Sequence, residues 1–169
     1  MSGTLDLYEL LEGMQPELDE GASYIFLTVP HDLAKRNTAS IGEIVANHAI
    51  ATFNEEEGLT VVVKSTFLQE HVLLAQEGGK LLGEDLKSFW KAFAEKEELP
   101  LMGHITMRIH SSLSAVGFTA AFSRALTETG ISCNVFAGYY HDHLFVPAAA
   151  QSKAMTVLTA LTKKSNKAQ

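Results

Sequence analysis

The alternation of apolar and polar residues is clearest in the second half of the chain, where its period changes several times. Residues 104–110 carry an apolar side chain at every second position, which is typical of a strand with one buried face. Residues 112–128 repeat apolar positions every three or four residues, as an amphipathic helix does. Gly130 then offers a left-handed stop, and residues 131–140 and 144–147 return to the strand pattern of a hairpin. The predicted order is strand, helix, strand, strand.

Ser111 and Ser112 stand where this predicted helix begins. A side-chain oxygen at a helix start accepts a hydrogen bond from a first-turn N–H that has no partner inside the helix, so we expect the serines to cap it. The first half of the helix is apolar nearly all round and includes the small residue Gly117, which favours coverage by another unit or subunit. The positive end of the helix dipole at such an interface suits a carboxylate. Simple capping is the alternative.

The first half of the chain shows the same order with a weaker pattern. Pro30 ends a predicted strand, and Asp32 is expected to cap a helix that starts near Leu33 and is short or split. The stretch FLTVPHDLA corresponds to TMRIHSSLS as strand, break, cap and helix start, which indicates an internal repeat. The other elements predicted here are a helical turn at 5–11, a strand at 24–29, and hairpin strands at 49–53 and 59–63.

An insertion of about forty residues separates the two repeats. It predicts helices near 68–75 and 84–96, joined across a turn at Gly78 and Gly79. In the second helix one apolar face has i, i+3, i+4, i+7 spacing. We expect this face to be buried in the protein's own core, with a groove on a partner as the alternative. Its residues are Leu86, Phe89, Trp90 and Phe93.

The composition restricts the function before any motif does. The chain has 169 residues, of which 46% are hydrophobic, which is sufficient for a sizeable core. A net charge of −7 argues against a sequence-independent nucleic-acid binder, which needs a basic surface. The sequence contains neither a signal peptide pattern nor the roughly 20 apolar residues of a membrane span. We therefore expect a cytoplasmic protein without a membrane partner.

Candidate catalytic and metal-binding residues are few. Cys133, the single cysteine, excludes an intrachain disulfide and alternates with apolar residues, so we expect a small core residue rather than a nucleophile. His141 and His143 flank Asp142 and could begin a zinc or nickel site. Two ligands are too few for a tight site, so we expect these rings to close the hairpin, and we predict neither a metal nor a cofactor. A small enzyme using this turn and His110 is the weakest hypothesis.

The stretch SSLSAVGFTAAFSRALTETGISCNV, with YYHDHLFVP behind it, resembles part of the ACT-domain family. It is similar to the first strand-to-helix loop, helix and second strand of the regulatory region of aspartate kinases, and the likeness is close over about residues 105–161. The resemblance implies an α+β fold of tandem ferredoxin-like (βαββαβ) units, with antiparallel sheets and helices on one face. It also implies an N-terminal unit with a helical insertion in residues 1–98 and a C-terminal ACT domain in residues 99–169.

The resemblance further implies that small amino-acid-like ligands bind where two units meet. The effector pocket of ACT domains is formed by the first loop and the start of the second strand. It carries over here onto Ser111, Ser112, Leu113, Val116, Gly117, Asn134 and Val135. The Asn134 amide can both donate and accept, which suits an amino acid. Many ACT domains have a glycine in the loop itself, whereas Gly117 is expected inside the helix.

The function expected from these observations is a regulatory sensor without catalytic activity. It is expected to bind an amino acid or similar small metabolite and to act on a downstream protein. A structural or oligomerisation module with a vestigial pocket is the alternative. Behind the helix expected at 148–161 the sequence has no further β-rich run, so the open sheet edge must be covered by the first unit or by a second subunit. We expect a homodimer.

Overall fold

The computed structural model describes residues 3–73 and 81–165, which form two compact units. Unit 1 joins Met1–Ala22 to Met102–Gln169, and unit 2 is Ser23–Leu101. These units differ from the predicted division into 1–98 and 99–169 in the placement of residues 1–22 and 99–101. In the described ranges, no helix has the length and apolar character that crossing a membrane requires.

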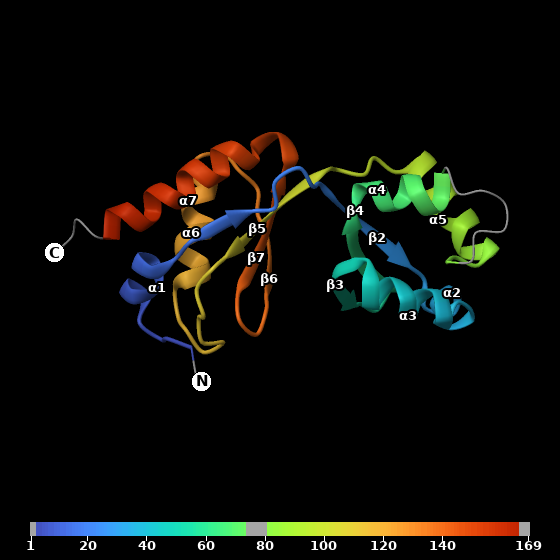
Figure 1. Ribbon diagram of the computed structural model, residues 1–169, viewed down its shortest axis with the longest axis horizontal. Helices are drawn as coiled ribbons and strands as arrows, with labels where there is room; N and C mark the ends of the chain where they lie inside the picture. Colours follow the sequence, from blue (N-terminus) through green and yellow to red (C-terminus); the bar gives the residue numbers. More distant parts are fainter. Residues whose placement is uncertain (1–2, 74–80, 166–169) are drawn as a thin grey trace. The chain divides into compact units, whose positions relative to one another are not determined.

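Unit 1 contains an antiparallel sheet in the order β1-β5-β7-β6 (Figure 1). Its strands are β1 (Pro16–Leu18), β5 (Met102–Met107), β6 (Asn134–Ala137) and β7 (Asp142–Pro147). The short strand β1 pairs with β5 at Leu18↔Ile105. The strand that the sequence lacks after the last helix is therefore supplied by the N-terminal segment, which belongs to the same unit. The expected homodimer thus loses the missing strand as its argument.

Three helices pack on one face of this sheet because their apolar residues join the strand residues in one core cluster. They are α1 (Leu7–Gly13), α6 (Phe118–Thr127) and α7 (Gln151–Ser165), the last preceded by a 3-10 turn at Ala148–Ala150. Phe122 and Leu126 of α6 are fully buried with Ile105 of β5 and Leu144 of β7. This α+β arrangement, with helices on one face, is the predicted fold class.

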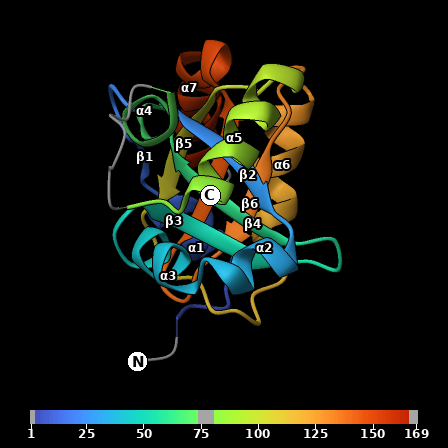
Figure 2. The same cartoon turned by 90° about the vertical axis from the view of Figure 1, so that its right-hand side faces the viewer.

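Unit 2 contains an antiparallel sheet in the order β3-β4-β2 (Figure 2). Its helices pack on the face that carries Ile25, Leu27 and Val29. The strands are β2 (Tyr24–Val29), β3 (Ala49–Asn54) and β4 (Leu59–Lys64). The helices are α2 (His31–Arg36), α3 (Thr38–Asn47), α4 (Ser65–Leu68) with a π-helical turn at Gln69–Leu73, and α5 (Glu84–Lys96). The predicted glycine turn at 78–79 lies outside the described residues.

The apolar stripe of α5 is buried in the core of unit 2, as predicted. Leu86 and Trp90 have no exposed surface, and Phe89 and Phe93 pack against the same cluster. The Trp90 indole also donates a hydrogen bond from Nε1 to the Thr28 carbonyl, 3.0 Å away. The insertion therefore supplies part of the core that covers the three-stranded sheet.

The predicted helix starts are wrong in both repeats. Helix α6 begins at Phe118, and its N-cap is Gly117, whose φ of 95° lies in the left-handed region. Ser111 and Ser112 precede this start and do not cap it, because their backbone pairs with the N-terminal segment: Ser112 N donates to Thr4 O at 3.0 Å. In unit 2 the N-cap of α2 is Pro30, whereas Asp32 lies within the first turn.

Candidate ligand-binding site

The predicted site centres on residues 108–117, which connect β5 to α6 and which we call the unit 1 loop. Backbone hydrogen bonds fix its path: Arg108 N donates to Gln15 O at 2.8 Å, and Ala115 N donates to Ser112 O at 2.9 Å. The Ser112 hydroxyl accepts from Ser114 N at 3.2 Å. The loop is thus an ordered turn structure tied to the N-terminal segment of the same unit.

The unit 1 loop exposes two large apolar side chains. Leu113 is 69% exposed and Val116 is 84% exposed, although both side chains prefer burial. Gly117 next to them is close to the α1 residue Leu7, since a Cβ on this glycine would lie 3.2 Å from Leu7 Cδ2. An apolar ligand or partner surface would therefore gain contact area on Leu113 and Val116 without displacing a core residue.

A buried carboxylate lies at the beginning of the loop. Asp142, the first residue of β7, is only 5% exposed, and its Oδ2 accepts a hydrogen bond from the Ser111 hydroxyl at 3.3 Å. Burial raises the pKa of this carboxyl, while the Ser111 hydrogen bond and the neighbouring His143 and His141 lower it. The Ser111 hydroxyl hydrogen is therefore occupied, and its oxygen lone pairs are the group that a ligand can address.

The tip of the β6–β7 hairpin lies beside the loop. His141 Nδ1 is 3.3 Å from Ile109 O, in agreement with the prediction that a histidine of this turn bonds to backbone. Tyr139 and Tyr140 are 67% and 62% exposed, and their rings lie 6.3 and 5.4 Å from the His110 ring. Sequence reasoning missed this aromatic cluster. Its signal is the pair of tyrosines at the hairpin tip, together with a histidine just after the preceding strand of the sheet.

The register places the other two predicted site residues away from the loop. Asn134 pairs with Phe145, which pairs with His104, three residues before the end of β5 that leads into the loop. At about 3.3 Å per residue, this separates Asn134 from the end of β5 by about 10 Å along the sheet. Val135 pairs with Leu144 and packs against the core beneath the helices. The structure thus brings together the five loop residues and leaves Asn134 and Val135 apart.

A second cluster, unrecognised in the sequence, joins β5 and β7. His104 Nε2 and His143 Nδ1 are 3.1 Å apart, and their rings stack with centroids 5.3 Å apart. Burial, followed by the charge of His143, lowers the pKa of His104 to about 4. His143 and His141 thus contact different partners. Residues 3–73 and 81–165 contain no group of three or more His, Cys, Asp and Glu side chains that could hold a metal ion.

The candidate nucleophiles have environments that oppose nucleophilic chemistry. Burial raises the pKa of the Cys133 thiol to about 11, so it is protonated at neutral pH. Ser111 donates to a carboxylate, whereas activation of a serine requires a base that takes its proton. Neither residue is therefore a prepared nucleophile in this arrangement.

Comparison with known families identifies the fold. Two ACT-domain models match the chain, one over residues 2–73 and the other over residues 103–160. The chain belongs to the ACT-domain family. The first ACT match includes the N-terminal residues that unit 1 contains, so β1 and α1 are part of the matched pattern. Membership in this family indicates a regulatory, ligand-binding role.

Solved structures agree with this assignment. A protein of unknown function from Vibrio cholerae, described as a possible transport protein, is 36% identical, covers 92% of this chain and 95% of its own, and has a TM-score of 0.62. The regulatory subunit of aspartate kinase from Thermus thermophilus is 15% identical over 86% of this chain and 95% of its own, with a TM-score of 0.54. At that identity the likeness shows the fold. A comparison with curated proteins finds no match.

The ACT framework also corrects the expectation about Gly117. This glycine was expected inside the helix, in contrast to the loop glycine of many ACT domains. It lies directly before α6, with positive φ, at the end of the unit 1 loop. The expectation that Gly117 lies inside the helix is therefore wrong.

Proposed function

We propose that this ACT-domain protein is a sensor without catalytic activity, which binds an amino acid at the unit 1 loop and thereby regulates a downstream protein. The observation that carries the proposal is the composition of the loop: exposed Leu113 and Val116 lie between a buried carboxylate at one end and a helix start at the other. An amino acid with an apolar side chain has a group for each of these: an ammonium for the carboxylate end, a side chain for Leu113 and Val116, and a carboxylate for the helix start.

The hydrogen bonds on the loop orient the proposed ligand. The Ser111 hydroxyl already donates to Asp142, so its oxygen suits an ammonium group, and the Asp142 charge repels a carboxylate there. At the other end Gly117 has no side chain with which to cap α6. The first-turn N–H groups of α6 and the positive end of its dipole favour the ligand carboxylate at that end. The sequence predicts the carboxylate at the helix start, which was expected at Ser111 and Ser112. In the proposed orientation it binds at the observed start of α6, after Gly117.

Leu113 and Val116 indicate the side-chain class of the ligand. Both are apolar and exposed, and the adjacent hairpin tip adds the aromatic rings of Tyr139 and Tyr140. We therefore infer an amino acid with an apolar side chain, for which L-leucine is the natural probe. Asn134 and Val135 lie apart from the loop of their own chain. In the proposed homodimer, these two residues of a second copy would contact the ligand instead.

The second candidate function is an interaction module with a vestigial pocket. The same exposed side chains favour it, because a contiguous apolar patch on a monomer also marks a protein contact. The two functions differ in their response to free amino acids, since the interaction module gains no stability from them.

A thermal-shift screen of the twenty amino acids separates these functions. Ligand at 100 times its dissociation constant adds about 2.7 kcal/mol to the free energy of unfolding. We expect an apolar amino acid to raise the melting temperature of the parent protein and of the control Val45→Asp, whose residue is exposed in unit 2. Val116→Asp should abolish the shift. If no amino acid shifts the parent, or if Val116→Asp responds like the parent, the sensor proposal is wrong.

A further inference from the structure

The two units differ at corresponding positions. Helices α3 and α6 each span ten residues, with Asn37 and Gly117 as their N-caps. Residues 30–37 of unit 2 therefore correspond to the unit 1 loop at 108–117. In unit 1 this stretch is an irregular turn structure, whereas in unit 2 it forms the helix α2 directly after β2.

The corresponding apolar residues of the two stretches differ in exposure, although Asp32 and Arg36 of unit 2 are exposed. The unit 1 loop leaves Leu113 and Val116 largely in solvent. In unit 2 the corresponding apolar residue Leu33 is 5% exposed, and Asn37 is 7% exposed. Asn37 Nδ2 donates to Leu33 O at 3.0 Å, which closes the end of α2 on itself.

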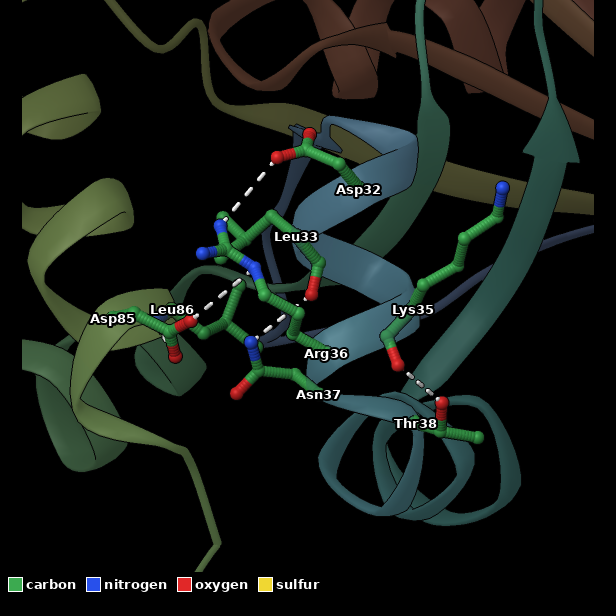
Figure 3. A network of polar contacts seen from close by, with 8 residues as sticks. All are labelled: Asp32, Leu33, Lys35, Arg36, Asn37, Thr38, Asp85 and Leu86. Atoms are coloured by element: carbon green, nitrogen blue, oxygen red, sulfur yellow. Dashed lines mark hydrogen bonds and ion pairs between the residues drawn. The ribbon is translucent and has the colours of Figure 1, made fainter.

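The start of α5 lies against this closed stretch (Figure 3). Asn37 Oδ1 is so close to Gly83 that a Cβ on this glycine would lie 2.2 Å from it. Arg36 lies between two carboxylates, with Nη2 3.5 Å from Asp32 Oδ2 and Nε 4.0 Å from Asp85 Oδ2. These exposed ion pairs contribute little energy, so the close Asn37–Gly83 approach is the specific element of the contact.

Core packing holds α5 in this position. Leu86 and Trp90 are fully buried, and the Trp90 indole bonds to Thr28 at the end of β2, two residues before Pro30. Moving α5 away would expose both side chains and leave the Thr28 carbonyl without its indole donor, which is costly in a buried region. The contact is thus a fixed part of unit 2 rather than a surface association.

We propose that α5 is a built-in cover, which holds residues 30–37 closed and so restricts ligand binding to unit 1, with one ligand per chain. Both helix starts meet another helix, since Gly117 before α6 lies beside Leu7 of α1 in unit 1. Unit 2 differs because the stretch before its N-cap is itself helical and its Leu33 is buried. The ligand part of this inference rests on the proposed function, whereas the cover itself is tested without any ligand.

Hydrogen exchange of backbone amides tests the cover. In the parent protein, the amides of residues 31–37 should exchange more slowly than those of residues 109–116, by roughly tenfold or more. Gly83→Ala should raise exchange at residues 31–37, because the added Cβ forces Asn37 away. Gly42→Ala is the matched control, since a Cβ there meets open space among the described residues, and it should not raise exchange at residues 31–37.

A second variant and a titration complete the test. If Gly83→Ala loses cooperative unfolding, Asn37→Ala removes the same contact from the other side, together with the Nδ2 bond to Leu33 O. Asn37→Asp is its control, because it loses only that bond and keeps Oδ1 beside Gly83. Exchange at residues 31–37 should rise more in Asn37→Ala than in Asn37→Asp. Isothermal titration of the parent with L-leucine should give one site per chain. Fast exchange at residues 31–37 of the parent, no response to either variant, or two equal sites per chain would overturn the cover. An absence of L-leucine binding together with slow exchange at residues 31–37 rejects the ligand assignment and supports the cover.

Discussion

The change in the free energy of unfolding caused by Gly117→Ala depends on where this residue lies. The sign for a position inside a helix is opposite to the sign for a position before the first turn. Inside a helix, glycine to alanine stabilises by roughly 0.5–1 kcal/mol. Gly117 instead precedes α6 with φ 95°, where a side chain costs about 1–2 kcal/mol. Its Cβ would also lie 3.2 Å from Leu7 Cδ2, a contact that the flexible leucine can relieve. We therefore expect Gly117→Ala to lower the free energy of unfolding by about 1–2 kcal/mol.

Two other glycines calibrate this value. Gly130 has φ 74° and open space around it among the described residues, so Gly130→Ala measures the backbone strain without a contact. We expect a loss of about 1 kcal/mol. Gly42 lies inside α3 in similar open space, so Gly42→Ala should stabilise by roughly 0.5–1 kcal/mol.

Urea unfolding followed by two signals assigns each change to its unit. Circular dichroism at 222 nm, roughly the helical minimum, follows all helices. The fluorescence of Trp90, the only tryptophan in the sequence, reports unit 2. Gly117→Ala should shift the dichroism transition more than the fluorescence transition, and Gly42→Ala should shift the fluorescence transition upward. A more stable Gly117→Ala protein would refute the left-handed helix start and restore the mid-helix interpretation.

Three further predictions concern buried groups. The pKa of His104 is about 4 in the folded protein and 6.5 in the unfolded chain, so the unfolded chain binds the proton first as pH falls. The free energy of unfolding should therefore decrease by at most about 3 kcal/mol between pH 7 and pH 4. In urea titrations, His104→Phe should make the free energy of unfolding less dependent on pH. Trp90→Phe should cost about 2–3 kcal/mol in urea unfolding, because it removes ring volume and the donor to Thr28 O. Cys133 should react with a thiol reagent at pH 8 much more slowly than free cysteine, since its raised pKa keeps it protonated. A rate equal to that of free cysteine would contradict the raised pKa of this half-buried thiol.

Elements with one strong local signal could be predicted from the sequence. The apolar run Tyr24–Val29 and the four-residue stripe of α5 each fit only one kind of element, and both lie where expected. The helix starts could not be predicted in the same way. Ser111 and Ser112 carry capping oxygens, but capping also requires a backbone that continues into a helix, and their backbone is paired with Thr4 instead.

Contacts between distant residues had no local signal. Strand β1 has three residues, begins with Pro16 and pairs with β5 about ninety positions later, so its pattern is too short to read as a strand. The His104–His143 pair depends on the register of β5 and β7, which a one-residue slip would abolish. The predicted binding loop was recognisable through the family resemblance, but the separation of Asn134 from it is again a matter of register.

An amide NMR titration with L-leucine tests the central claim most directly. If the unit 1 loop binds an apolar amino acid, saturable shift changes should appear at residues 110–118 and at the hairpin tip 138–142, while residues 30–37 stay unchanged. Val116→Asp should remove the changes and the control Val45→Asp should keep them. Saturable changes at residues 30–37 with an unchanged unit 1 loop, or the same titration curve for Val116→Asp as for the parent, would contradict the account.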